Sequence, residues 1–325
     1  MMTKAIRYER TGGPEVMQWV DVEVGAPGEG EIRVKQSACG LNYIDVYFRT
    51  GLYPQQLPAG LGMEAAGEVV AVGAGVTSVK VGERVAYVGR PPGAYAQERV
   101  LRADQVIRLP DAISDEQAAS VMLQGLTAQY LLRRTYRVQP GDTILIQAAA
   151  GGVGLLVCQW AKALGATVIG TVGSDEKAEV AKAHGCDYPI VYTREDFTAR
   201  VREITGGAGV PVVYDSIGKD TYVKSLDCLA PLGMFVSFGN ASGPLPPIDS
   251  SEFSSRGSLF FTRPTLFSYI AKRSDYEAMS AELFEVIASG KVKTSINQRY
   301  ALKDVGQAHA DLEARRTTGS TILIP

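Results

Sequence analysis

The sequence has few cysteines, almost no net charge and no long apolar run, and each shortage excludes a class of protein. Its four cysteines are far apart and form no C-x-x-C pair, so they indicate neither a disulfide framework nor a zinc knuckle. No apolar segment approaches the roughly 20 residues of a membrane span, and the N-terminus MMTKAIRYER lacks a signal-peptide core. A net charge of −2 offers no basic surface to nucleic acid or membranes. We therefore expect a protein of the reducing cytoplasm without a membrane or nucleic-acid partner.

What is present fits an ordinary globular chain of about two domains. The sequence has 325 residues, of which 46% are hydrophobic and 21% charged. Residues 1–125 contain short runs such as Glu31–Lys35, in which polar and apolar residues alternate, with glycine and proline turns between them. This pattern favours a compact β-rich domain.

The segment from Thr143 to Gly154, TILIQAAAGGVG, predicts a buried strand, a turn of small residues and the start of a helix. A helix that begins in such a turn offers free N–H groups to an anion. The segment is typical of a dinucleotide-binding turn, with Ala where the first Gly of G-x-G-x-x-G often stands. Because a glycine pattern with one member missing is weak by itself, the assignment of a dinucleotide-binding turn depends on the strands and helices that surround it.

From about residue 126 strands and helices alternate. We predict strands at 144–146, 167–172, 189–192, 212–215, 234–238 and 258–262. Thr193 with Asp196 suggests a capping box for the helix that ends at Ile204. Six strands with intervening helices predict an α/β fold with a doubly wound parallel sheet. Residues 267–325, with one helix and a final strand, are too few for a separate domain and are expected to pack on the N-terminal one.

Seven motifs, in order along the whole chain, resemble the medium-chain dehydrogenase/reductase superfamily, in particular its zinc-free quinone oxidoreductases, related to zeta-crystallin. These motifs are GGPEV at 12–16, CGLNYID at 39–45, GMEAAG at 62–67, GAYA at 93–96, AAAGGVG at 148–154, YDSIG at 214–218 and SFGN at 237–240. Bacterial NADPH:quinone reductases look like the nearest members. The resemblance implies a Rossmann NADPH-binding domain at 126–266 and a GroES-like β-rich catalytic domain at 1–125 and 267–325.

The resemblance also bears on metal. Zinc-dependent relatives bind their catalytic zinc with a Cys in the second of these motifs and a His before the Glu of the third, and those positions hold Asn42 and Met63 here. The chain has only two histidines, His184 and His309, whereas a catalytic zinc needs three protein ligands. We expect no metal.

The end of the predicted second strand of the sheet favours NADPH over NADH. NAD-selective folds usually carry an acid there, but this strand runs into Gly173 and Ser174. Ser174 can donate to a phosphate and Lys177 can meet one as a point charge. The resemblance places Gly173–Lys177 and Tyr192 around the adenosine 2′-phosphate. Lys177 could instead be a solvated helix residue, and the nearby Asp175 and Glu176 are a mild objection.

The resemblance implies further contacts along NADPH. The pyrophosphate would lie at Gly151, Gly152 and Val153, and the other predicted contacts are Asn42, Tyr47, Thr127, Tyr130, Ser216, Phe238, Gly239, Asn240, Thr262, Arg263, Pro264 and Arg315. Arg315 is the weakest of these, since a charged helix end is usually solvated surface.

Hydride reduction of a quinone needs little acid–base chemistry, so few catalytic residues are expected. Asn42 could hydrogen-bond a carbonyl of the acceptor, and Tyr47 or Tyr53 could stack on a quinone or donate a proton. The two tyrosines could equally be packing residues of an aromatic loop. Asp45 is more simply a residue that orders its loop, and Glu64 a buried structural acid.

Three functions stay open at this point: an NADPH:quinone reductase, an NADPH-dependent reductase of α,β-unsaturated aldehydes or ketones, and a non-catalytic crystallin-like protein that binds NADPH or RNA. The near-neutral charge argues against RNA. The apolar segment Ser258–Thr262 is a candidate sheet edge, and because uncovered edges tend to pair, we expect a homodimer through it, as the resemblance also implies.

Overall fold

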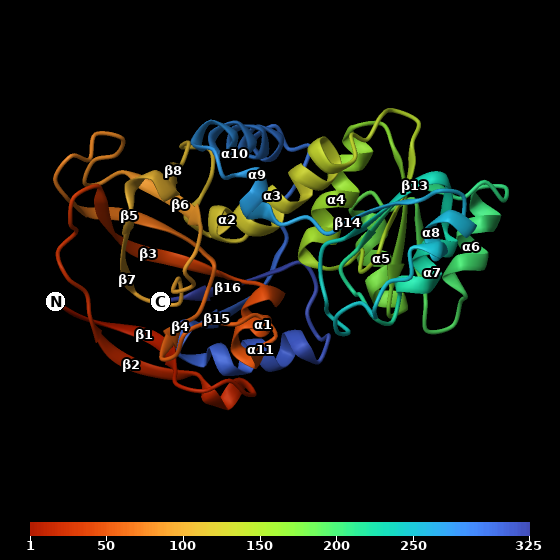
Figure 1. Ribbon diagram of the computed structural model, residues 1–325. Helices are drawn as coiled ribbons and strands as arrows, with labels where there is room; N and C mark the ends of the chain where they lie inside the picture. Colours follow the sequence, from red (N-terminus) through yellow and green to blue (C-terminus); the bar gives the residue numbers. More distant parts are fainter. The chain divides into compact units, whose positions relative to one another are not determined.

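The computed structural model describes residues 1–325, and the chain folds into two compact units, many of whose elements are labelled in Figure 1. The first unit comprises Met1–Leu126, Lys272–Ala288 and Thr294–Pro325. The second comprises Thr127–Ala271 and Ser289–Lys293.

The first unit is built mainly of strands. They are β1 (Met2–Tyr8), β2 (Gln18–Glu23), β3 (Glu31–Leu41), β4 (Ala59–Gly60), β5 (Glu64–Val72), β6 (Arg84–Val88), β7 (Glu98–Arg102), β8 (Val106–Arg108), β15 (Ile296–Ala301) and β16 (Ser320–Ile324). One sheet has the order β2-β1-β4 and the other β15-β16-β3-β5-β6-β8, with β7 also paired to β3. Strand β16 runs antiparallel to β3, so that Leu323 lies opposite Cys39. The end of the chain is thereby part of the N-terminal sheet.

The helices of the first unit are short, apart from α10. They are η1 (Pro14–Val16), α1 (Tyr43–Thr50), η2 (Ala103–Gln105), α2 (Asp115–Ala119), α10 (Arg273–Ala288), η4 (Leu302–Asp304) and α11 (Val305–Glu313), while α3 (Met122–Tyr130) continues into the second unit. Helix α1 follows β3 directly. The carboxylate of Asp45 accepts the N–H of Asn42 at its start (2.9 Å), and Gly51, with φ of +84°, ends it.

The second unit contains a parallel sheet of six strands, β9 (Thr143–Ile146), β10 (Thr167–Val172), β11 (Tyr188–Val191), β12 (Val210–Asp215), β13 (Leu229–Ser237) and β14 (Phe260–Thr262). The strand order is β11-β10-β9-β12-β13-β14, and every neighbouring pair is parallel. This confirms the predicted doubly wound α/β sheet. The order reverses between β9 and β12, and in such sheets ligands bind outside the carboxyl ends of the strands at that point.

Helices cover both faces of this sheet (Figure 1). The helices of the second unit are the π-helix η3 (Leu131–Thr135), α4 (Gly152–Ala163), α5 (Asp175–Ala183), α6 (Phe197–Ile204), α7 (Tyr222–Asp227), α8 (Ser251–Ser255) and α9 (Leu266–Tyr269). Helix α4 packs beside α5, and α6 beside α7. The apolar residues Leu145, Ile169, Val213 and Phe235, one from each of four strands, form part of one buried core. No helix of the chain is both long and apolar enough to cross a membrane.

Two local predictions were wrong. Helix α6 is capped by Asp196, whose carboxylate accepts the N–H of Thr198 (3.0 Å), whereas the hydroxyl of Thr193 donates to the carbonyl of Gly173 (3.3 Å). Strand β14 begins at Phe260, and Ser258 lies outside it with φ of +59°. A side chain next to a strand end can bond to either of two nearby backbone groups, and the sequence pattern alone does not decide between them.

Candidate functional site

The turn between β9 and α4 brings backbone segments into direct contact. A Cβ on Gly154 would lie 2.3 Å from the carbonyl oxygen of Ala148, closer than real Cβ atoms come. The N–H of Ala149 donates to the carbonyl of Thr171 (2.9 Å), and that of Gly151 to the carbonyl of Ala148 (3.0 Å). No side chain caps α4 at Gly151, so the first N–H groups of the helix, including those of Gly152 and Val153, suit a phosphate.

The residues predicted for the 2′-phosphate lie together at the end of β10. A Cβ on Gly173 would lie 3.0 Å from the hydroxyl of Tyr192. Ser174 caps α5 by accepting the N–H of Lys177 (3.3 Å). Its hydroxyl also bonds the carboxylate of Glu176 and so lowers the pKa of that group. Ser174 therefore has protein partners of its own at the place where it was predicted to meet a phosphate.

Arg194 is a basic residue at this edge that the sequence analysis missed. Its guanidinium lies 2.5 Å from the carboxylate of Asp175 and lowers the pKa of that carboxyl. Both side chains are more than half exposed, so the pair adds little to stability. Arg194 thus offsets the charge of Asp175, one of the two acids beside the predicted phosphate site. Arg194 reaches it only because β10 and β11 are adjacent, and no local sequence signal marks that.

The loops that follow β12 and β13 lie against each other. A Cβ on Gly239 would come within 2.5 Å of the carbonyl oxygen of Ser216. The N–H of Phe238 donates to the carbonyl of Asp215 (2.8 Å). Ser216, Phe238 and Gly239 are thereby brought together at the carboxyl end of the sheet.

Arg263, the residue that follows β14, bonds the loop after β13. Its Nη1 donates to the carbonyl of Ser237 at 2.7 Å. With the amide of Asn240 oriented to satisfy its neighbours, its oxygen accepts from Nη2 of Arg263 at 3.0 Å and its nitrogen donates to the carbonyl of Gly239 at 2.9 Å. Arg263 therefore holds the loop after β13 from the adjacent strand.

Thr127 and Tyr130 are both buried in α3. The ring of Tyr130 stacks on that of Tyr269, with centroids 4.5 Å apart and planes 5° from parallel. The hydroxyl of Tyr269 in turn bonds that of Thr135 (2.6 Å). The stack adjoins the π-helix η3, an uncommon conformation that is frequent at functional sites.

In the first unit, the amide of Asn42 is held from two sides. Its nitrogen donates to Glu64 (2.6 Å), and its oxygen accepts from Gln124 (3.1 Å). Glu64 is fully buried and also accepts the N–H of Leu123 (2.5 Å). Burial raises the pKa of Glu64 to about 8, against the opposing effect of these hydrogen bonds. Glu64 is therefore protonated for most of the time at pH 7, which agrees with a structural acid.

Asp45 orders the loop before α1, as expected. Besides the N–H of Asn42, its carboxylate accepts the hydroxyl of Tyr95 (2.8 Å). It is fully buried, and burial raises its pKa to about 7 despite these bonds. The ring of His309 lies next to Tyr95 (3.4 Å), and burial lowers the pKa of His309 to about 3, so the ring is neutral.

Tyr47 and Tyr53 belong to an aromatic cluster on α1 and the turn after it. Their ring centroids are 5.2 Å apart and nearly edge to face, and Tyr43 lies 5.6 Å from Tyr47. Tyr47 is buried and Tyr53 half-buried. Burial and Glu313 raise the pKa of Tyr43, while the charge of Arg315 opposes them. The exposed Arg315 therefore lies on the same side of the first unit as this cluster.

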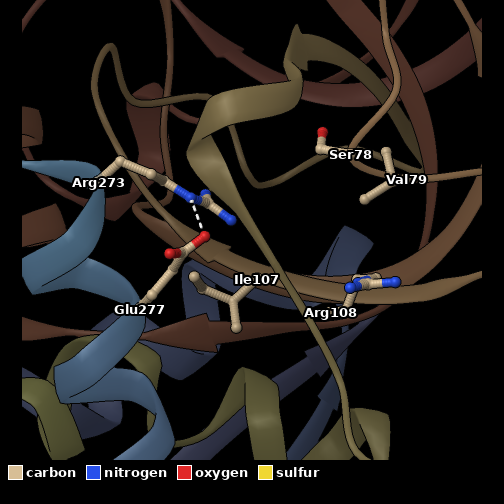
Figure 2. A pocket seen from close by; sticks show the side chains of 6 residues that line it. All are labelled: Ser78, Val79, Ile107, Arg108, Arg273 and Glu277. Atoms are coloured by element: carbon tan, nitrogen blue, oxygen red, sulfur yellow. Dashed lines mark hydrogen bonds and ion pairs between the residues drawn. The ribbon is translucent and has the colours of Figure 1, made fainter.

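A separate pocket of 370 Å³ lies in the first unit at the start of α10 (Figure 2), lined by Ser78, Val79, Ile107, Arg108, Arg273 and Glu277. Its main charges are paired, because Nε of Arg273 lies 2.7 Å from Glu277 and Nη1 donates to two backbone carbonyls. None of the predicted site residues lines it.

The residues at the family's zinc positions do not fit a zinc ion. An amide at Asn42 and a thioether at Met63 are not the thiolate and imidazole that zinc selects. The nearby Cys39 donates its thiol to the carbonyl of Ala94 (2.9 Å), and burial raises its pKa to about 12. No group of three or more His, Cys, Asp or Glu side chains is arranged to hold a metal.

Comparison with known proteins defines the class first. The model of the alcohol dehydrogenase GroES-like domain matches residues 28–111, and that of the zinc-binding dehydrogenase matches residues 152–285. Together with the parallel sheet, these matches define a two-domain dehydrogenase/reductase of the medium-chain superfamily.

Relatives along the whole chain then define the family. The chain is 54% identical to a quinone oxidoreductase of Pseudomonas aeruginosa, over 100% of both chains, and 47% identical to a 2-haloacrylate reductase of a Burkholderia species, over 100% of this chain and 99% of that one. The structure of Escherichia coli quinone oxidoreductase complexed with NADPH matches with a TM-score of 0.97 at 50% identity, over 99% of this chain and 100% of that one. The chain belongs to the quinone oxidoreductase family, as its motifs predicted.

The raised pKa of Glu64 predicts a specific pH dependence of stability. Its folded pKa of about 8 exceeds its ordinary value of 4.5, so the folded protein binds the extra proton and loses stability as pH rises from about 5 to about 8. Glu64→Gln cannot ionise. The free energy of unfolding of the wild type, measured in urea, should fall relative to that of this variant by up to about 1.4 kcal/mol per pH unit.

The test is how the difference in free energy of unfolding between the two proteins changes between pH 5 and pH 8. Its absolute size is not the test, because a glutamine also changes the hydrogen bonds to Asn42 and Leu123 at every pH. Asp45 is present in both proteins, so the comparison isolates Glu64 together with its electrostatic interaction with Asp45. A difference that does not vary with pH would show that Glu64 is not protonated in the folded state.

Proposed function

We propose that this protein is an NADPH-dependent quinone reductase that transfers reducing equivalents from NADPH to quinones without a metal. The observation that carries the proposal is the 54% identity over the whole length to a quinone oxidoreductase, supported by the 0.97 TM-score match to the E. coli enzyme complexed with NADPH. The start of α4, which no side chain caps, offers a place for the pyrophosphate. The end of β10, which carries no acidic residue, offers a place for the 2′-phosphate.

In this proposal the second unit is the NADPH-binding domain. Gly151, Gly152 and Val153 bind the pyrophosphate, and Gly173, Ser174, Lys177 and Tyr192 surround the 2′-phosphate. The predicted contacts nearer the nicotinamide are Phe238, Gly239, Asn240, Thr262, Arg263 and Pro264, and Ser216 is predicted to lie along the cofactor. The roles of Thr127, Tyr130, Asn42, Tyr47 and Arg315 along the cofactor stay predictions from the family resemblance.

Lys177→Ala should separate the two nicotinamide cofactors. Loss of a charge-assisted hydrogen bond to the 2′-phosphate should raise the KM for NADPH about tenfold to a hundredfold and leave that for NADH within about twofold. Lys182→Ala, at an exposed position in the last turn of the same helix, is the matched control and should change neither. Equal effects of Lys177→Ala on both cofactors would remove Lys177 from this role.

The acceptor chemistry is proposed to rest on Asn42. NADPH would supply a hydride, and a quinone that accepts it develops negative charge on a carbonyl oxygen. The amide nitrogen of Asn42 has a second hydrogen besides the one that Glu64 accepts, and we assign it to that oxygen. Because the raised pKa of Glu64 favours its protonated form, Glu64 places little negative charge beside this amide. Tyr47 and Tyr53 would stack on the acceptor.

A second candidate is reduction of an activated carbon–carbon double bond. The observation that favours it is the 47% identity over the whole chain to a 2-haloacrylate reductase. Both reactions need a hydride acceptor with a polarised carbonyl group, so Asn42 would have the same role in each.

NADPH oxidation should be measured with a panel of ortho- and para-quinones, α,β-unsaturated aldehydes and 2-chloroacrylate. We expect turnover with at least one class of quinone and a kcat/KM at least about tenfold higher than for the other acceptors. Asn42→Ala should lower kcat more than it raises the KM for NADPH. Turnover of enals or 2-chloroacrylate alone would reject the quinone assignment.

A homodimer through β14 is the proposed assembly. This strand is the edge of the sheet, and Phe260 on it is 55% exposed. Leu232 on the neighbouring β13 is 68% exposed. Unpaired edges with exposed apolar side chains favour strand pairing between copies.

Phe260→Lys should therefore yield a monomer in analytical ultracentrifugation, since a buried lysine at the edge would oppose pairing. Val223→Lys, on α7 and similarly exposed at 50%, should keep the assembly of the wild type. A Phe260→Lys protein that sediments as a dimer would contradict the edge-to-edge arrangement. A cytoplasmic location and the lack of a nucleic-acid partner stay predictions from the cysteine pattern and the charge.

A further inference from the structure

A buried chain of hydrogen bonds crosses the carboxyl ends of three strands in the second unit. The hydroxyl of Thr171, on β10, donates to the side-chain oxygen of Gln147, just after β9. The amide nitrogen of Gln147 donates to the hydroxyl of Ser225 on α7 at 3.0 Å. That hydroxyl donates to the carboxylate of Asp215, the last residue of β12, at 2.8 Å. All four side chains are at most 1% exposed.

The carboxylate of Asp215 sets the direction of this chain. It also accepts the N–H groups of Ile217 (2.8 Å) and Gly218 (2.9 Å) and the hydroxyl of Thr221 (2.7 Å). Ser225 donates the one hydrogen of its hydroxyl to this carboxylate and has only its lone pairs left for Gln147. Gln147 must then present its nitrogen to Ser225 and its oxygen to Thr171.

At its other end the chain meets the turn proposed for the pyrophosphate. The hydroxyl of Thr171 accepts the backbone N–H of Ala148 at 3.4 Å. The backbone carbonyl of Thr171 accepts the N–H of Ala149 at 2.9 Å. Ala148 has φ of +57°, a conformation that residues other than glycine rarely adopt and that needs support from its surroundings. The chain therefore connects the turn after β9 with the loop after β12, where Ser216 lies.

We propose that Gln147 is a positioning residue, which through Thr171 and Ser225 holds the turn Ala148–Gly154 in the shape that binds the pyrophosphate of the dinucleotide. This rests on the proposed NADPH function. An amide suits the position because it has an acceptor at one side and a donor at the other. A glutamate would place an acceptor against Ser225, and a leucine would leave both hydroxyls without this partner.

The proposal predicts which ligands are affected. NADPH and NADH share the pyrophosphate, so loosening the turn weakens both by the same factor. Adenosine 2′-monophosphate has the 2′-phosphate but no pyrophosphate, so its binding stays unchanged. This pattern differs from that of Lys177→Ala, which acts on the 2′-phosphate.

The first test is the pair Thr171→Val and Thr171→Ser. Valine has the shape of threonine without the hydroxyl, whereas serine keeps it. Thr171→Val should raise the Kd for NADPH and for NADH alike, by about fivefold to tenfold, as expected for one lost hydrogen bond. Thr171→Ser should stay within about twofold of the wild type, and so should kcat at saturating NADPH in both variants. Inhibition by adenosine 2′-monophosphate should not change.

Ser225→Ala approaches Gln147 from the opposite side and serves if Thr171→Val does not fold. It should weaken both dinucleotides as well. In the double variant the two effects should not add, because both act through the one amide of Gln147.

Different outcomes would contradict the proposed function and the proposed role of Gln147. A wild-type protein that binds no NADPH would overturn the proposed function and this inference with it. If the wild type binds NADPH, unchanged dinucleotide affinity in Thr171→Val and Ser225→Ala, with only a lower melting temperature, would show a purely structural chain and overturn the inference alone. An equal loss for adenosine 2′-monophosphate would also overturn it, because the damage would then not be confined to the turn.

Discussion

At the turn between β9 and α4, main-chain atoms lie so close together that only glycine or alanine side chains fit. A Cβ on Gly154 would lie 2.3 Å from the carbonyl oxygen of Ala148, and one on Gly170 would lie 2.5 Å from the Cβ of Ala149. This close approach places the start of α4 directly at the carboxyl ends of β9 and β10. The exposed N–H groups of the helix then point to where a phosphate can bind. The proposed function of the second unit depends on this contact.

Each unit also encloses a buried carboxyl group that depends on its neighbours for hydrogen bonds. Glu64 accepts one amide hydrogen and one backbone N–H, and its pKa rises to about 8. Asp215 accepts two backbone N–H groups and two hydroxyls, and its pKa is also raised by burial, although these hydrogen bonds oppose the shift. The neutral acid in the first unit lies beside Asn42, and the carboxylate of the second anchors a chain that leads to the turn. In both places burial raises the pKa of the carboxyl group and the surrounding donors oppose the shift.

Much of the second unit could be predicted from its sequence, since apolar runs alternate with helical periods and glycines stand at the turns. The order and direction of the six strands followed from this alternation. Arg194, Gln147 and Gln124 could not be found in the same way, because their partners are 19, 78 and 82 residues away along the chain. Thr193 was misassigned because its hydroxyl bonds Gly173 on the neighbouring strand instead of capping α6.

The sequence by itself determined the class of fold, the position of the glycine-rich turn that is proposed to bind phosphate, and the residue types at the zinc positions, Asn42 and Met63. These are properties of short segments, set by spacing and by side-chain chemistry. Only the tertiary structure decided which buried polar groups are neighbours, that burial raises the pKa of Glu64 beside Asn42, and that Gln147 joins Thr171 to Ser225. Hydrogen bonds across strands depend on the register of the sheets and on the dielectric surroundings that packing creates, and no local pattern encodes either.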